Sequence, residues 1–301
     1  MVIGIDVGGT RISGGLASDR GELRSRLRRN TDREGGAAAG FSEIVRLVTD
    51  LEELAARAGF PVSRIGVGFG GPVDFDRGVV LLSHHVEGWE EFPLRSRLEQ
   101  HFRTPVIVDN DANAGTLAEW EFGAGRGVND LIYINIGTGI GGGIISGGRL
   151  IRGARNLAGE IGHSIVARSG ALCTCGKRGC LESCASGEAM ARRGSEALGR
   201  RVTGRELFEL ARSGDATALG VLNAVIEDLA HGIGFAVSLL NPAAVIIGGG
   251  LSEAPEELFL RPLRVAIPSY CLGESARHLS IEAAQLRYDA GVMGAIALAL
   301  S

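Results

Sequence analysis

The chain has 301 residues and a mass of 31.4 kDa, which is long for one small domain and suits two lobes of roughly 110 to 190 residues. Apolar residues make up 45% of the sequence and charged residues 22%, a balance that excludes wholesale disorder. The net charge of −4 argues against a nucleic-acid coat or a membrane-surface protein, so we expect neither partner. Lys177 is the only lysine, and its neighbours fit neither a Walker loop nor a Schiff-base site.

The N-terminus and the cysteines indicate the compartment. No apolar run approaches the length of about 18 residues that a membrane span needs, and Asp6 interrupts the apolar N-terminus, so we expect no signal peptide. Four of the five cysteines lie close together, namely Cys173, Cys175, Cys180 and Cys184. This clustering favours a metal site in a reducing compartment over a disulfide framework, and we expect a cytoplasmic protein.

The first predicted element is a β-hairpin with a glycine tip at residues 8–10, and a similar pattern recurs 129 residues later. The expected strands are 2–7 and 12–16 in the first copy, and 131–136 and 144–145 in the second. Ile5 aligns with Ile134, Gly8 with Gly137, and Gly14 with Gly143. The repeat predicts two related lobes that each begin with a glycine-tipped hairpin.

The remaining chain alternates between predicted strands and helices. In chain order we expect a strand after Gly21, a helix at about 41–58, a strand at 65–69, a helix after Pro93, a strand at 105–108, a helix at about 112–122, helices near 186–198, 203–212 and 215–240, a strand at 244–247 with a helix beyond it, and a final helix at 291–300. Thr203 and Glu206 are spaced as a capping box. The pattern predicts an α/β protein whose two lobes, 1–112 with about 288–301 and 113–287, flank a cleft.

Three glycine loops follow predicted strands, and their bared backbone N–H groups suit phosphate binding. The loops are Gly8-Gly9-Thr10, Gly137-Thr138-Gly139 and Gly248-Gly249-Gly250. Two further strings, at 66–71 and 137–142, match the dinucleotide fingerprint, but neither precedes a helix, so a Rossmann dehydrogenase is excluded.

The segment 109–113, Asp-Asn-Asp-Ala-Asn, lies where a predicted strand gives way to a helix, a common place for catalytic groups. It does not fit a calcium loop, because Ala114 and Trp120 occupy the sixth and twelfth positions. Either aspartate could simply be the helix N-cap. Two carboxylates and two amides within one turn nevertheless favour a functional role for at least one of them.

A metal site is predicted from three cysteines and a histidine, with glycines between them that suit a tight knuckle. The four residues are His163, Cys173, Cys175 and Cys180. Three thiolates and one imidazole are a sufficient set for a tetrahedral structural zinc ion. Cys184 is expected to be a small buried residue rather than a ligand.

These motifs occur in the order seen in the ROK family of sugar kinases, which the chain resembles from residue 2 to about 295. The resemblance is carried by Asp6-x-Gly-Gly-Thr10, Gly71-Pro-Val-Asp74, Gly88-Trp89 with Pro93-Leu94, Asn110-Asp-Ala-Asn113, Gly137-Thr-Gly-Ile-Gly141, Glu160-Ile-Gly-His163, the knuckle from Cys173 to Glu182, and the glycines 248–250. It implies an actin-like or hexokinase-like ATPase fold with duplicated ribonuclease-H-like lobes. The implied activity is ATP-dependent phosphorylation of a hexose at the 6-hydroxyl, with glucose as the best single substrate.

Residue roles follow from the same resemblance. Asp111 falls on the family's catalytic base, Asp6 on the residue that positions Mg²⁺ with ATP, and Asp109 is left as an incidental polar residue. The zinc ligands match the four residues already named. The sugar contacts fall on Gly71, Asn110, Glu160, His163 and Glu182, with His85 at a further sugar-contact position.

Two departures from the family pattern leave the sugar open. Gly70 stands where proline is common, and His85 stands where asparagine is common. An N-acetylhexosamine such as N-acetylglucosamine or N-acetylmannosamine, fructose or allose could therefore replace glucose, and polyphosphate could replace ATP. A non-catalytic sugar sensor is disfavoured, because Asp6 and Asp111 are both present and only five residues precede Asp6, too few for a DNA-binding helix-turn-helix. We expect a homodimer or homotetramer.

Overall fold

The computed structural model describes residues 1–83 and 86–301 and divides into two compact units. Unit 1 comprises residues 1–127, 150–158 and 288–301, and unit 2 comprises residues 128–149 and 159–287. The units depart from the expected lobes at two places, because residues 113–127 and 150–158 both belong to unit 1.

Unit 1 is built on a five-stranded sheet with the strand order β3-β2-β1-β4-β7. The strands are β1 (Val2–Val7), β2 (Arg11–Ala17), β3 (Leu23–Asn30), β4 (Arg64–Phe69) and β7 (Val106–Asn110). The first three form an antiparallel meander, whereas β4 runs parallel to β1 and β7 runs parallel to β4. A two-stranded ribbon, β5 (Val73–Asp74) with β6 (Val79–Val80), was not predicted.

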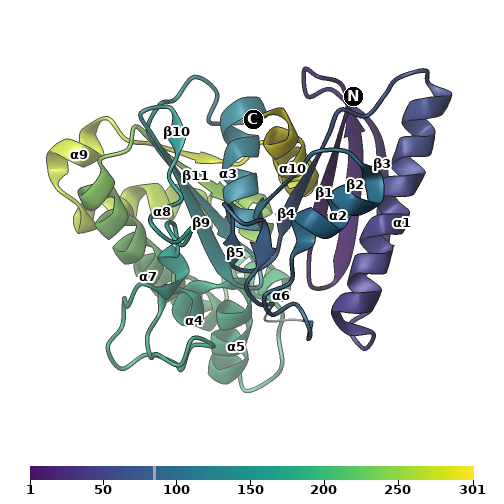
Figure 1. Ribbon diagram of the computed structural model, residues 1–301. Helices are drawn as coiled ribbons and strands as arrows, with labels where there is room; N and C mark the ends of the chain where they lie inside the picture. The colour runs from purple at the N-terminus through teal and green to yellow at the C-terminus, as the bar shows by residue number, and fades with distance from the viewer. Residues whose placement is uncertain (84–85) are drawn as a thin grey trace. The chain divides into compact units, whose positions relative to one another are not determined.

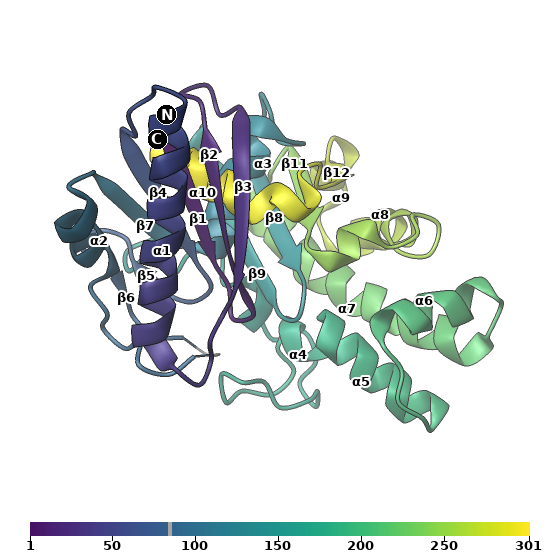
Figure 2. The same cartoon turned by 90° about the vertical axis from the view of Figure 1, so that its right-hand side faces the viewer.

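Helices cover both faces of this sheet. In Figure 1, α1 (Gly36–Arg57) and α2 (Leu94–Phe102) lie on one side, and α3 (Asp111–Phe122) and α10 (Ala290–Leu300) lie on the other. The C-terminal α10 packs against both β1 and β4, as Figure 2 shows from another side. Gly4 and Gly66 permit this close packing, because a Cβ atom at either position would collide with the backbone of α10.

Unit 2 repeats the same plan with the strand order β10-β9-β8-β11-β12. The strands are β8 (Leu131–Ile136), β9 (Ile140–Ser146), β10 (Arg149–Leu150), β11 (Ala244–Gly248) and β12 (Ser280–Ala283). The predicted second hairpin is present, but β9 begins at Ile140 rather than at residue 144. Val7 pairs with Ile12 in the first hairpin, whereas Ile136 pairs with Ile140 in the second, so that Gly142, not Gly143, is the counterpart of Gly14.

The helices of unit 2 pack around α7 (Ala216–Leu240), whose buried side chains belong to the core beneath β8 and β11. The others are α4 (Leu181–Ala185), α5 (Gly187–Leu198), α6 (Gly204–Arg212), α8 (Leu260–Ala266) and α9 (Gly273–Arg277). Thr203 and Glu206 form the predicted capping box at the start of α6. By length and composition α7 could cross a membrane, but half of its most apolar window is buried inside the structure, as in a core helix.

Candidate active site

Two carboxylates lie close together in unit 1. Asp6 is the fifth residue of β1 and Asp111 is the first residue of α3. Burial, and next the neighbouring Asp111 carboxylate, raise the pKa of Asp6 from 3.8 to about 7. Gly291, in the first turn of α10, leaves the space that the Asp6 carboxylate occupies. The pair concentrates negative charge at one place, which is where a phosphate-bound cation would be attracted.

Asn110, and neither aspartate, is the N-cap of α3. Its side-chain oxygen accepts hydrogen bonds from the backbone N–H groups of Ala112 at 2.8 Å and Asn113 at 3.3 Å. Its Nδ2 donates to the Gly71 carbonyl at 3.0 Å, so the turn after β4 is tied to the β7–α3 junction. Because the cap is an amide, neither aspartate carboxylate serves as the N-cap of α3.

Asp109, expected to be an incidental polar residue, is held in a buried ion pair. Its side chain is 1% exposed and forms an ion pair with Arg152, with 2.8 Å between Oδ2 and Nε. Asp111, in contrast, lies beside Gly70, where a Cβ atom would be 3.6 Å from Oδ2. The two carboxylates therefore have different surroundings, since the helix starts between them.

Gly70 accounts for its own departure from the family pattern. Its backbone N–H donates to the Val7 carbonyl at 2.9 Å, a bond that proline could not make. The absence of a side chain also leaves space between Gly8 and the Asp111 carboxylate.

The first glycine loop is held from outside by residues that the sequence did not single out. Thr31 Oγ1 donates to the Gly8 carbonyl at 2.8 Å, and Arg33 donates to the Gly9 carbonyl at 2.6 Å and to Thr10 Oγ1 at 3.0 Å. Arg33 therefore supplies positive charge beside this loop. A sequence signal for Arg33 would have been weak, because it follows a strand without a recognisable motif.

The other two glycine loops meet in unit 2. Gly248 pairs with Asn135 at the ends of β11 and β8, and a Cβ atom at Gly249 would collide with the Ile136 carbonyl. Gly137 and Thr138 of the second loop and Gly250 of the third border one pocket of about 760 Å³. Thus the structure brings two of the three predicted phosphate loops together within one unit, and it places the loop 8–10 in unit 1.

The walls of this pocket come from helices that the sequence analysis did not associate with function. They include Met190 of α5, Phe208 of α6 and Leu251, together with the charged Glu188, Arg205, Glu209 and Arg212. Apolar walls with a few polar groups are typical of small-molecule sites. No local sequence motif identifies these residues, because many side chains of suitable size and polarity can line a pocket.

The predicted metal ligands converge in unit 2. One donor atom from each of His163, Cys173, Cys175 and Cys180 lies within 4.8 Å of every other. The Cys173 Sγ–His163 Nδ1 and Cys175 Sγ–Cys180 Sγ distances are both 3.6 Å, close to the edge of about 3.8 Å of a tetrahedron with metal–sulfur bonds of about 2.3 Å. Cys184 is buried as expected and is not a member of the cluster.

The cluster also has the electrostatics of a cation site. Burial raises the pKa of the Cys180 thiol to about 12, so a thiolate there requires a compensating positive charge. The residues present therefore fit a structural zinc ion by geometry and by donor chemistry.

Glu182 links this cluster to the second glycine loop. Its Oε2 accepts a hydrogen bond from the Ile140 N–H at 3.0 Å, and its Oε1 accepts one from Thr174 Oγ1 at 3.5 Å. The His163 ring turns Nδ1 toward Cys173 and Nε2 toward Glu160, whose Oε2 lies 3.9 Å away. Of the predicted sugar contacts, the structure thus groups Glu160, His163 and Glu182 in unit 2, and Gly71 and Asn110 in unit 1; His85 lies outside the described residues.

Comparisons with known proteins agree over the whole chain. A model described as "ROK family" matches residues 2–301. A glucokinase from Thermotoga maritima is 34% identical, with 99% of this chain and 96% of the relative covered. An N-acetylmannosamine kinase from Shigella flexneri is 32% identical, over 99% and 98% of the two chains. A ROK family glucokinase from Streptomyces griseus, solved with glucose and AMPPNP, superposes with a TM-score of 0.83 at 36% identity, covering 99% and 98%.

Proposed function

Because this chain belongs to the ROK family, we propose that it transfers the γ-phosphoryl group of ATP to the 6-hydroxyl of a hexose, most favourably glucose. The observation that carries the proposal is the half-buried Asp111 at the start of α3, whose carboxylate lies near Asp6 and Gly70. A panel of hexoses and N-acetylhexosamines, assayed for ADP release with ATP and Mg²⁺, tests it. ADP release no higher than background with every sugar would refute a sugar kinase.

Asp111 is the proposed base. The acceptor O–H bond breaks as the new O–P bond forms and the bond from Pγ to the leaving ADP oxygen breaks; the proton passes to an Asp111 carboxylate oxygen. Because the transition state is loose and the proton leaves late, much of the contribution of Asp111 is orientation of the hydroxyl. Mg²⁺ bound with ATP would neutralise charge on the phosphates, and the Asp6 carboxylate would hold it through a water molecule.

The pocket between α5, α6 and the loops 137–139 and 248–250 is the proposed nucleoside site. Its volume of about 760 Å³ suits a nucleotide, and Thr138 offers a hydroxyl donor at its edge. The Streptomyces griseus relative was solved with an ATP analogue, which supports a nucleotide as phosphoryl donor here. Polyphosphate as donor predicts activity without any occupant of this pocket. Because that reaction releases no ADP, measuring sugar phosphate formation with polyphosphate in place of ATP distinguishes the two.

Sugar hydroxyls are proposed to contact the carboxylates of Glu160 and Glu182 and the imidazole of His163. A carboxylate accepts from a hydroxyl, whereas the His163 Nε2 carries the ring hydrogen once Nδ1 binds the metal and would donate to a sugar oxygen. In unit 1, Asn110 keeps one amide hydrogen beyond the one it donates to Gly71.

We also propose one structural zinc ion per chain, held by His163 and the three cysteines of the cluster. Bound zinc would fix the tautomer and orientation of the His163 ring and the fold of the knuckle, and it would take no part in the phosphoryl transfer.

N-acetylmannosamine is the second candidate substrate, since a kinase for that sugar is 32% identical over nearly the whole chain. The ratio of kcat/KM for glucose and N-acetylmannosamine decides between them. A higher value for any other sugar in the panel would refute glucose specificity while leaving the kinase proposal intact.

Self-association as a homodimer or homotetramer is the proposed quaternary state. Phe235 and Leu239 of α7 are 60% and 69% exposed, and Leu272 beside them is 68% exposed. Such a group of exposed apolar side chains is unusual on a monomer. Light scattering after size exclusion tests the state, and Leu239→Glu should shift it toward monomer.

The reduced cysteines support a cytoplasmic location, which cell fractionation tests.

A further inference from the structure

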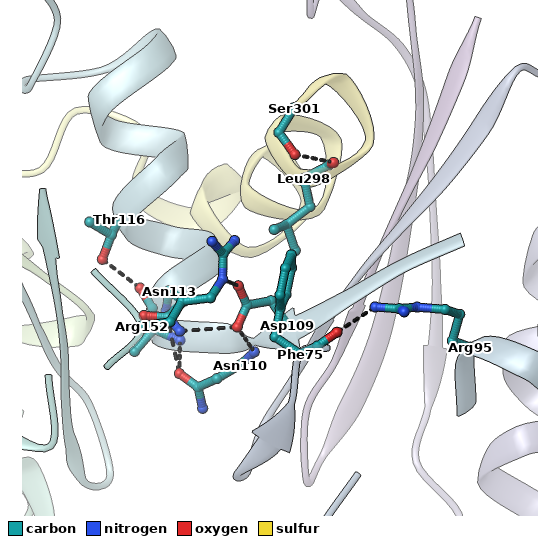
Figure 3. A network of polar contacts seen from close by, with 10 residues as sticks. Phe75, Arg95, Asp109, Asn110, Asn113, Thr116, Arg152, Leu298 and Ser301 are labelled. Atoms are coloured by element: carbon teal, nitrogen blue, oxygen red, sulfur yellow. Dashed lines mark hydrogen bonds and ion pairs between the residues drawn. The ribbon is translucent and has the colours of Figure 1, made fainter. Parts of the chain in front are cut away.

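Arg152 belongs to the segment 150–158 and lies at the centre of a network of polar contacts within unit 1 (Figure 3). Its Nε donates to Asp109 Oδ2 at 2.8 Å, and its guanidinium group stacks 3.7 Å above the ring of Phe75. The Phe75 carbonyl in turn accepts a hydrogen bond from Arg95 at the start of α2. Arg152 is therefore fixed on one side by a carboxylate and on the other by an aromatic face.

Asp109 passes this constraint to the β7–α3 junction. Its Oδ1 accepts from the Asn110 N–H at 2.7 Å and from Asn113 Nδ2 at 3.0 Å, while Oδ2 faces Arg152. Asn113 is 2% exposed, and its own side-chain oxygen has no donor within the described part of the chain. The Asn113 amide is thus oriented by Asp109 alone.

We propose that Arg152 and Asp109 act as a positioning pair for the reaction, by holding the junction that presents Asn110 and Asp111. This inference rests on the proposed sugar kinase activity. Neither residue touches substrate in this scheme; each acts through the backbone N–H of Asn110 and the amide of Asn113. Asn110 caps α3 and binds Gly71, so its conformation sets where Asp111, the next residue, begins the helix.

The physical reason is the burial of the Asp109 charge. A carboxylate that is 1% exposed and loses its arginine partner must find a new donor or take up a proton. Either response alters the bonds from Oδ1 to the junction. A displacement of about 1 Å in a catalytic group is enough to reduce turnover by about 10²-fold.

The test compares Arg152→Met with a matched control in the same unit. Arg29→Met removes an arginine of comparable exposure, 33% against 23% for Arg152, which pairs with the more exposed Asp50 at 2.5 Å and with Glu43 at 3.5 Å, at a site between β3 and α1. We expect Arg152→Met to lower kcat at least tenfold and to weaken glucose binding, with the KM for ATP changed less than twofold. Arg29→Met should leave kcat, glucose binding and the KM for ATP unchanged, even if it lowers the melting temperature as much as Arg152→Met does. Arg152→Lys, which keeps the charge, should recover most of the lost kcat.

A double-mutant cycle and hydrogen exchange complete the test. If the two residues act as a pair, Arg152→Met combined with Asp109→Asn should be no slower than the worse single variant. If the decreases in kcat of the two single variants multiply in the double variant, the two residues act independently and the proposed pair is overturned. Amide exchange at residues 109–113 should accelerate in Arg152→Met and not in Arg29→Met; unchanged exchange there would overturn the proposal whatever the activity. If the protein without substitutions phosphorylates no hexose, the kinase proposal is refuted instead. The exchange data would still show whether Arg152 holds the junction at residues 109–113.

Discussion

Asp109 and Asp111 are two residues apart, yet their surroundings assign them different work. Asp109 is enclosed by hydrogen-bond donors, whereas Asp111 faces the glycines at 8 and 70. Replacing Asp111 with asparagine keeps shape and hydrogen bonding but removes the base, so kcat should fall by at least about 10²-fold. Sugar affinity by calorimetry and the melting temperature should change little. An Asp111→Asn variant with nearly full kcat would contradict the assignment.

At Asp6, function and stability oppose each other. Its pKa is raised from 3.8 to about 7, so the folded protein binds a proton more tightly than the unfolded chain. The folded state is therefore favoured at low pH, and this stability is lost as the pH rises from about 4 to about 7. Moving the pKa that far corresponds to at most about 4 kcal/mol.

Asp6→Asn should remove this loss. Without nucleotide or metal, we expect the variant to melt at a higher temperature than the unchanged protein at pH 8, and the difference to shrink toward pH 5. It should also have little kinase activity, because Mg²⁺ is poorly held. Thermal melts across that pH range measure the effect, and a lower melting temperature for Asp6→Asn at pH 8 would contradict the charge argument.

Among the elements, the cysteine knuckle carries a prediction about metal. Elemental analysis of tag-free protein should give close to one equivalent of zinc, and chelation should increase hydrogen exchange across residues 163–182. Because Glu182 joins the knuckle to the second glycine loop through Ile140, glucose affinity should fall as well. Well under half an equivalent of zinc would argue against the metal. Unchanged glucose affinity after chelation would refute only the coupling.

The packing of α10 on β4 gives a prediction about stability. A Cβ atom at Gly66 would strike the Ala295 carbonyl, which is backbone and cannot move alone. Gly66→Ala should therefore destabilise the protein by about 1–3 kcal/mol. Gly220 provides the control, because it lies in α7 with open space around it, and Gly220→Ala should stabilise by up to about 1 kcal/mol. Denaturant unfolding monitored by circular dichroism measures the free energy of unfolding of both variants. Equal values for the two would show that α10 moves to accommodate the added methyl group.

At the scale of the whole molecule, the sequence predicted what short-range patterns encode. Repeated apolar runs with glycine tips gave the two hairpins, and the four metal-binding side chains share one short stretch of chain. Asp109 could not be judged from its neighbours, because its partner Arg152 is 43 residues away and is brought to it only by the fold. The membership of α3 in unit 1 depends likewise on its packing against the C-terminal α10.

The interrupted order of unit 1 also has a consequence for synthesis. The polypeptide leaves this unit after residue 127, returns for residues 150–158, and contributes α10 only at 288–301. On a translating ribosome, β1 and β4 emerge first, but the surface formed by Gly4 and Gly66 stays without its helix until nearly 300 residues have been joined. Unit 2 has all its residues earlier. The segment translated first is therefore the one that must wait longest to become native, and nascent chains halted before residue 288 should expose it to chaperones and proteases.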